Sequence, residues 1–130
     1  MRNEEFIEMT IGKPWANRSC NFERVDCWGL ICLYFLHVKG INIHHTDKYD
    51  ADEDFITCFT EEVSFWNLCD TSHSSDIFVA YVGKMPAHVG LIINGMAYHS
   101  RAESSHVRFD KIRTIERLFT KVEYYNYAVN

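Results

Sequence analysis

The most apolar segment of the chain follows Asp26 and is closed by Gly40. Its apolar side chains fall on all sides of a helix rather than in one stripe, which is typical of a helix packed on more than one side. Asp26 is a suitable N-cap residue, and Gly40 suits the left-handed residue that ends many helices. The pattern therefore predicts a buried central helix between these two residues.

The rest of the N-terminal half is more polar. Residues 3–10 have the pattern of a short amphipathic helix, and the polar segment 12–24 is expected to form an extended loop that leads into the central helix. A second helix is expected at 53–66, with polar connections on both sides.

From Asp76 onward the pattern changes to the alternation of β-strands. Helices followed by an antiparallel sheet indicate an α+β fold, and the composition changes nowhere in a way that would separate a second module, so residues 1–130 are expected to form one domain. The predicted strands are residues 77–82, 87–93, 96–101, 107–109 and 122–129.

The Asn94-Gly95 pair between two apolar runs predicts a two-residue type I′ hairpin. With Ile93 opposite Met96, the register continues through five further pairs to His88 opposite Arg101. Residues that share one face then include His88, Gly90, His99 and Arg101, and the other face carries the apolar residues Val89, Leu91, Ile93, Met96 and Tyr98. Diagonal neighbours lie within about 8 Å of each other, so the two imidazoles are expected to form a hydrogen bond, with Gly90 leaving space between them.

Cys27 comes directly after the predicted N-cap, at the first turn of the central helix. The helix dipole and unpaired N–H groups of a first turn stabilise a thiolate. Set against the histidine face, this arrangement suits covalent hydrolysis, with Cys27 as nucleophile, His88 as base and His99 as the group that orients His88. The backbone N–H of Cys27 and a second, unassigned donor are expected to bind the oxyanion.

The same residues could instead have purely structural roles, and the predicted geometry does not decide between the two interpretations. A cysteine in a helix is commonly a packing residue, and histidines on a sheet face are often half-exposed polar residues. Arg101 is either an ordinary surface charge or a group that binds a carboxylate.

Composition excludes several classes of function. A formal charge of −5 argues against general nucleic-acid binding, and no apolar stretch is long enough to span a bilayer. The five cysteines have no paired spacing, which indicates free thiols in a reducing compartment. Cys32, Cys58 and Cys69 are expected in the core, and Cys20 in a polar loop.

Four sequence blocks resemble the NlpC-type cysteine peptidases of the papain-like superfamily, and most closely the tail-tip and tail-assembly peptidases of bacteriophages. The resemblance implies a papain-like NlpC fold, with Cys27 as nucleophile, His88 as base and His99 as third polar residue. It also implies hydrolysis of peptidoglycan stem peptides, commonly between γ-D-glutamate and diaminopimelate, with no metal or organic cofactor. The blocks are Gly12-Lys13-Pro14-Trp15, Asp26-Cys27-Trp28-Gly29-Leu30, Ala87-His88-Val89-Gly90-Leu91 and Tyr98-His99-Ser100.

The chain departs from the family pattern in the residues expected to shape the substrate cleft. Trp15 stands where many members have a tyrosine that is thought to assist the oxyanion hole. Ala16 to Ser19 replaces a glycine-rich stretch, and Ser75-Asp76 stands where Gly-Asp is common. Trp15 is expected to contact substrate, and the residues expected to bind stem-peptide carboxylates are Arg18, Arg24 and Arg101.

Three alternative functions remain at this stage. The chain could be a structural tail-assembly protein with little activity, or an acyl or amide transferase of the same superfamily. A zinc site of Cys27, His88 and His99 is a third alternative, although no paired ligand motif supports it.

The N-terminus lacks a signal-peptide pattern, and no wall-binding module is evident in the sequence. We therefore expect assembly in the host cytoplasm, incorporation into a virion tail with other tail-tip proteins, and action at the bacterial wall during penetration.

Overall fold

A computed structural model of the chain describes residues 1–17, 19–43, 66–101 and 106–127. Within these ranges, no helix has the length and apolarity needed to cross a membrane. In chain order the elements are α1 (Asn3–Thr10), α2 (Cys27–Tyr34), η1 (Phe35–Lys39), β1 (Trp66–Cys69), η3 (Ser72–Ser74), β2 (Ile77–Val82), β3 (Met85–Ile93), β4 (Met96–Ser100), β5 (Val107–Asp110), α4 (Ile112–Leu118) and β6 (Lys121–Tyr127).

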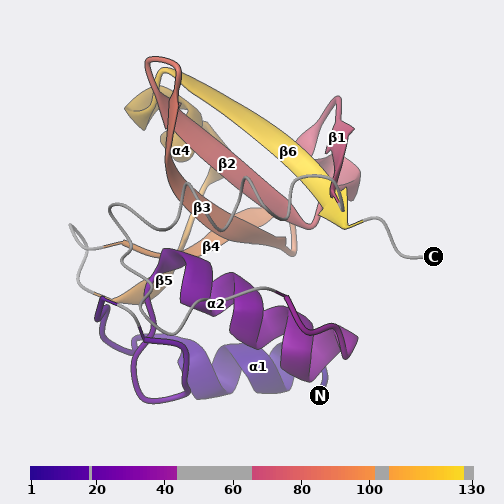
Figure 1. Cartoon of the computed structure of the whole chain (residues 1–130), viewed down its shortest axis with the longest axis vertical. Coiled ribbons are helices and arrows are strands. Elements are labelled where there is room, and N and C mark those ends of the chain that lie inside the picture. Colours follow the sequence, from indigo (N-terminus) through magenta and orange to yellow (C-terminus); the bar gives the residue numbers. More distant parts are fainter. Residues whose placement is uncertain (18, 44–65, 102–105, 128–130) are drawn as a thin grey trace.

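The strands form one antiparallel sheet in the order β1-β6-β2-β3-β4-β5. Helices α1 and α2 lie together on one side of this sheet, and α4 lies on the other side (Figure 1). The predicted α+β class with an antiparallel sheet is confirmed.

Helix α2 is the centre of the larger hydrophobic core. Every residue of α2 is buried, as its all-round apolar pattern predicts. On one side it contacts the sheet through β3 and β4, and on the other the Tyr34 ring meets the Phe6 ring of α1 edge-on at 5.1 Å between centroids. A smaller cluster fills the opposite face of the sheet, under α4, and its buried members are Phe78, Ala80, Ala97, Ile115 and Tyr124.

Both ends of the central helix match their sequence signals. The Asp26 carboxylate accepts a hydrogen bond from the Gly29 N–H at 2.7 Å, so it is the N-cap. The α-helix ends at Tyr34 and continues as the π-helical turn η1 up to Gly40. Gly40 has φ 70°, the left-handed conformation that a glycine adopts without steric cost.

The predicted hairpin turn between β3 and β4 is also confirmed. Asn94 and Gly95 have φ values of 55° and 74°, as a type I′ turn requires. The register pairs Ile93 with Met96, then Ile92 with Ala97 and Leu91 with Tyr98. The paired region ends there, three pairs earlier than predicted, so the two strands are no longer paired where they carry the two histidines.

Other boundaries and environments differ from the prediction. Strand β1 and helix α4 were not predicted, and the predicted helix at 53–66 falls outside the described residues except for Trp66, which begins β1. The thiol of Cys20 is part-buried and donates to the Gly29 carbonyl at 3.3 Å, so Cys20 is not simply a loop thiol. Cys69 is only partly buried, although it packs against the smaller core cluster. Cys32 is buried as predicted, and Cys58 lies outside the described residues.

Candidate active site

The start of α2 is held in place by two backbone hydrogen bonds. The Val25 N–H donates to the Pro14 carbonyl at 3.2 Å, and the Asp26 N–H donates to the Ser19 carbonyl at 3.1 Å. Gly29 is required nearby, because a Cβ at this residue would collide with the Ser19 carbonyl oxygen. Cys27 is the first residue of α2 and is only 5% exposed. The segment that precedes α2 therefore fixes where the Cys27 side chain begins.

A side-chain hydrogen bond ties this segment to β4. The Ser100 hydroxyl donates to the Val25 carbonyl at 2.7 Å, and both residues are fully buried. Val25 lies two residues before Cys27, and Ser100 directly follows His99. The bond therefore places the start of the Cys27 helix beside the strand that carries His99.

His88 lies next to an irregularity in β3. The register between β2 and β3 shifts after the pair of Ala80 with His88, because Tyr81 pairs with Pro86 and leaves Ala87 as an extra residue. Bulges of this kind redirect neighbouring side chains. The His88 Nε2 lies 2.8 Å from His99 Nδ1, which confirms the predicted hydrogen bond between the two imidazoles.

The hydrogen-bond chain continues from His99 to the end of β5. The His99 Nε2 lies 2.7 Å from an Asp110 carboxylate oxygen, Oδ2. The other oxygen, Oδ1, accepts from the Arg108 guanidinium at 3.0 Å. The side chain of His99 is fully buried and that of Asp110 is 19% exposed, so the pair is largely screened from water.

Aromatic rings pack against the two imidazoles. The Phe119 ring, just after α4, is stacked on the His88 ring at 6.0 Å between centroids. The Phe78 ring contacts both imidazoles, at 5.8 Å from His88 and 5.9 Å from His99. Gly90 admits the Phe78 ring, because a Cβ at this residue would overlap that ring and approach the His99 Cβ to 2.7 Å. The space that the sequence analysis assigned to Gly90 is therefore filled by Phe78.

Burial shifts the proton equilibria of both histidines in the same direction. Desolvation holds the pKa of His88 well below 6.5, and the nearby His99 and Arg101 lower it further. Burial also lowers the pKa of His99, although its bond to the Asp110 carboxylate acts in the opposite direction. Both imidazoles are consequently neutral at pH 7.

The histidine face is not the face that α2 covers. The rings of His88 and His99 adjoin Phe78, a member of the smaller cluster on the α4 side, whereas Cys27 belongs to the larger core with Val89 and Leu91. The Ser100–Val25 hydrogen bond places the segment before α2 next to the end of β4, beyond the point where the pairing of β3 and β4 ends.

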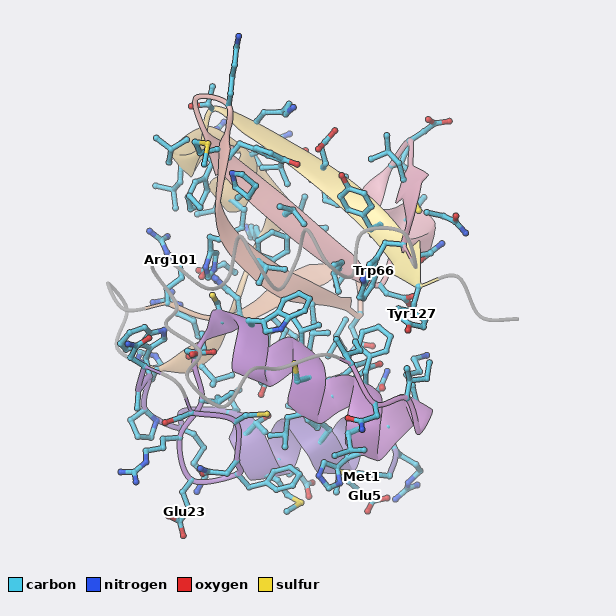
Figure 2. The ribbon with its side chains drawn as sticks, in the orientation of Figure 1. Met1, Glu5, Glu23, Trp66, Arg101 and Tyr127 are labelled. Atoms are coloured by element: carbon cyan, nitrogen blue, oxygen red, sulfur yellow. The ribbon has the colours of Figure 1, made fainter. Side chains whose placement is uncertain are left out.

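Two of the predicted substrate-binding residues, Trp15 and Arg101, are described by the structure near the start of α2. Trp15 is half-buried and follows Pro14, whose carbonyl binds Val25, so it adjoins the start of α2. Arg101 lies on the side of the molecule where α2 begins, whereas Trp66 and Tyr127 lie on the opposite side (Figure 2). The Arg101 guanidinium stands 5.3 Å from the centre of the Phe119 ring.

Of the two remaining predicted arginines, only Arg24 is among the described residues. Arg24 is exposed in the turn before α2, where its backbone N–H donates to the Asn21 side chain at 3.0 Å. Arg18 lies outside the described residues.

Asp110 and Phe119 are among the residues of the site that were missed at the sequence level. Asp110 shares a face with His99 because β5 pairs Arg108 opposite His99 and Asp110 lies two residues further on. This relation was accessible from the sequence only with the register of β4 and β5, which no tight-turn motif specifies. Phe119 carried no signal, because the helix α4 that positions it was not predicted.

Among the described residues, no group of three or more histidine, cysteine or acidic side chains is arranged to hold a metal ion. The geometry thus provides no support for the zinc alternative. His88 and His99 use the facing nitrogens to bond each other at 2.8 Å.

Comparison with known proteins identifies one family. The sequence model described as "NlpC/P60 family" matches residues 12–123 of this chain. Comparison with curated protein sequences gives no significant match.

Three solved structures have a similar fold. NlpC1 from Trichomonas vaginalis is 14% identical with a TM-score of 0.68, and the match covers 95% of this chain and 42% of that one. NlpC2 from the same organism is 14% identical with a TM-score of 0.64, over 95% and 45% of the two chains. The NlpC/p60 domain of the peptidoglycan hydrolase SagA is 14% identical with a TM-score of 0.63, over 93% and 92%. This chain therefore spans less than half of the two Trichomonas chains and nearly all of the SagA domain.

Proposed function

The chain belongs to the NlpC/P60 family, and from this premise we propose that it is a cysteine peptidase that hydrolyses peptide bonds in peptidoglycan. The observations that carry the proposal are the His88–His99 hydrogen bond and the Ser100–Val25 bond, which joins the strand of His99 to the segment just before Cys27. The similarity to a domain of a peptidoglycan hydrolase supports the choice of substrate class.

The proposed reaction begins with proton transfer from the Cys27 thiol to His88. His88 is suited to accept this proton because it is a neutral imidazole at pH 7. Its Nε2 is engaged with His99, so Nδ1 is the nitrogen that takes the proton. The resulting thiolate attacks the carbonyl carbon of the scissile bond, and the oxyanion is bound by the Cys27 backbone N–H at the helix start.

The remaining steps regenerate the enzyme. As the C–N bond breaks, His88 gives its proton to the leaving amine and a thioester remains on Cys27. A water molecule then loses a proton to His88 and attacks the thioester carbonyl. Cleavage of the C–S bond releases the carboxylic product, and the proton returns to the sulfur.

The specific bond and the setting are finer parts of the proposal. From the resemblance of the four sequence blocks to phage tail peptidases, we propose cleavage between γ-D-glutamate and diaminopimelate by a component of a virion tail. In this proposal, Trp15, Arg18, Arg24 and Arg101 contact the substrate. Detection of the protein in purified virions, together with reduced penetration by virions that carry Cys27→Ala, is the expected result.

Digestion of purified diaminopimelate-type peptidoglycan is the test of the activity. The wild-type protein is expected to release stem-peptide fragments, which mass spectrometry identifies, and Cys27→Ala is expected to release none. Cys32→Ala is the matched control, because Cys32 is a second buried cysteine on the same helix, five residues further on. If neither the wild type nor Cys32→Ala releases fragments, the weight moves to a non-catalytic role. If the fragments carry a new acyl acceptor instead of a free carboxylate, the reaction is a transfer.

A further inference from the structure

We propose that Asp110 is a positioning residue that fixes which ring nitrogens of His99 and His88 carry protons. The proposal deepens the proposed peptidase function and rests on it for its catalytic consequence. Its structural part concerns only the chain of hydrogen bonds from Arg108 to His88 and can be tested without any substrate.

The direction of each hydrogen bond follows from the chemistry of Asp110. An ionised carboxylate only accepts hydrogen bonds, so His99 must donate from Nε2 across the 2.7 Å contact. A neutral imidazole carries one N–H, and the Nδ1 of His99 is therefore an acceptor. His88 must then donate from Nε2 across the 2.8 Å contact between the rings.

With these hydrogen-bond directions, Nε2 of His88 carries the proton and Nδ1 carries the free lone pair. Burial lowers the pKa of both histidines, so both are neutral at pH 7. Each ring therefore carries a single N–H proton. A base that is to take a proton from Cys27 needs an unprotonated nitrogen directed away from His99. Asp110, at the other end of the hydrogen bonds that lead through His99 to His88, sets this state because its carboxylate requires a donor from His99.

Arg108 determines what a substitution at Asp110 does. The guanidinium only donates, and it donates to Oδ1 of Asp110 at 3.0 Å. In an Asp110→Asn variant the same guanidinium retains the amide oxygen and turns the NH₂ group toward His99. His99 Nε2 then becomes an acceptor, His99 Nδ1 becomes a donor, and His88 is left with its proton on Nδ1.

The experiment is ¹⁵N–¹H NMR of the imidazoles in the full chain at pH 7.5. The wild type is expected to carry the ring proton on Nε2 of both His88 and His99. Asp110→Asn is expected to move both protons to Nδ1. Because Arg108 holds the amide in the inverted orientation, Arg108→Ala added to Asp110→Asn is expected to return both protons to Nε2.

Kinetics with a stem-peptide substrate give the second readout. We expect Asp110→Asn to lower kcat by about 10²- to 10⁴-fold, the range of general-base contributions, and the added Arg108→Ala to restore at least about tenfold of that loss. Asp70→Asn is the control for loss of one negative charge, because Asp70 is exposed. It is expected to leave both the tautomers and kcat unchanged.

Two outcomes overturn the proposal. One is a wild-type spectrum with the His99 proton on Nδ1, which needs no variant and stays informative if Asp110→Asn fails to fold. The other is an Asp110→Asn spectrum with wild-type tautomers. A wild type with the expected tautomers but no hydrolysis would refute the proposed function and leave the role of Asp110 in the proton pattern intact.

Discussion

Among single residues, Gly90 has little freedom to change. Its lack of a side chain admits the Phe78 ring between β2 and the two imidazoles. The Phe78 and Phe119 rings together restrict the rotation of the His88 ring, which the hydrogen bond to His99 alone would not do. Small and aromatic residues around the site thus supply the orientation that a proton-transferring group requires.

We expect Gly90→Ala to destabilise the fold by about 1–3 kcal/mol, because the added methyl group overpacks a buried contact. The new Cβ would approach the His99 Cβ to 2.7 Å and would overlap the Phe78 ring. Urea unfolding of the single variants and of Gly90→Ala/Phe78→Leu measures the effect. Because leucine is smaller than phenylalanine, Gly90→Ala should cost less unfolding free energy in the Phe78→Leu background than in the wild type. If the losses of the two single variants simply add in the double variant, Phe78 is not the group that the new methyl meets.

At the scale of elements, the site depends on how β4 is bonded to two N-terminal segments. The Ser100 hydroxyl holds the Val25 carbonyl before α2 at 2.7 Å. The Tyr98 hydroxyl, two residues earlier, lies 2.7 Å from the Thr10 hydroxyl at the end of α1. Both bonds are buried, but only the first one adjoins Cys27.

Ser100→Ala should therefore affect catalysis as well as stability. Removal of its hydroxyl leaves the buried Val25 carbonyl without this donor, which we expect to cost about 1–3 kcal/mol of unfolding free energy. The helix start is then less well held, and we expect kcat to fall roughly 10- to 100-fold. Circular dichroism melts and peptidoglycan digestion measure the two effects.

Thr10→Val is the matched control for Ser100→Ala. It removes a buried hydroxyl that bonds Tyr98 and the Phe6 carbonyl, so a similar loss of stability is expected. Its activity below the melting temperature should match that of the wild type. Equal losses of kcat in both variants would show that activity follows global stability rather than the Ser100–Val25 bond.

The features that could be predicted from the sequence are those that a few neighbouring residues determine. The Asp26 cap, Gly40 and the Asn94-Gly95 turn each specify a boundary through a few neighbouring residues, and all three occur as predicted. Helix α4 was missed because its short segment has one buried residue, Ile115, and no side-chain cap. Asp110 was missed for a different reason, since its contact with His99 depends on pairing across a connection that has no fixed-register turn.

For the whole molecule, two buried neutral histidines make stability depend on pH. Among the residues that the structure describes, His88 has His99, Arg101, Phe78 and Phe119 as neighbours, and none of these four is anionic. His99 has Asp110 as an anionic partner, but burial and the nearby arginines still lower its pKa. In the unfolded chain both rings return to an ordinary pKa near 6.5.

The sign of the effect follows from proton binding. Below about pH 6.5 the unfolded chain takes up protons that the folded chain resists, so acid favours unfolding. Each of the two histidines should lower the unfolding free energy by up to about 1.4 kcal/mol per pH unit, from pH 6.5 down to its folded-state pKa. Above pH 7 neither contributes to the slope.

Urea unfolding at half-unit steps between pH 5 and 8 tests this expectation. His88→Gln removes one titrating ring, so its unfolding free energy should fall less steeply than that of the wild type below pH 6.5. His73→Gln, which alters an exposed histidine, should keep the wild-type slope. Parallel curves for the wild type and His88→Gln would mean that His88 takes up a proton in the folded protein as readily as in the unfolded chain. That result would contradict the lowered pKa that burial gives His88.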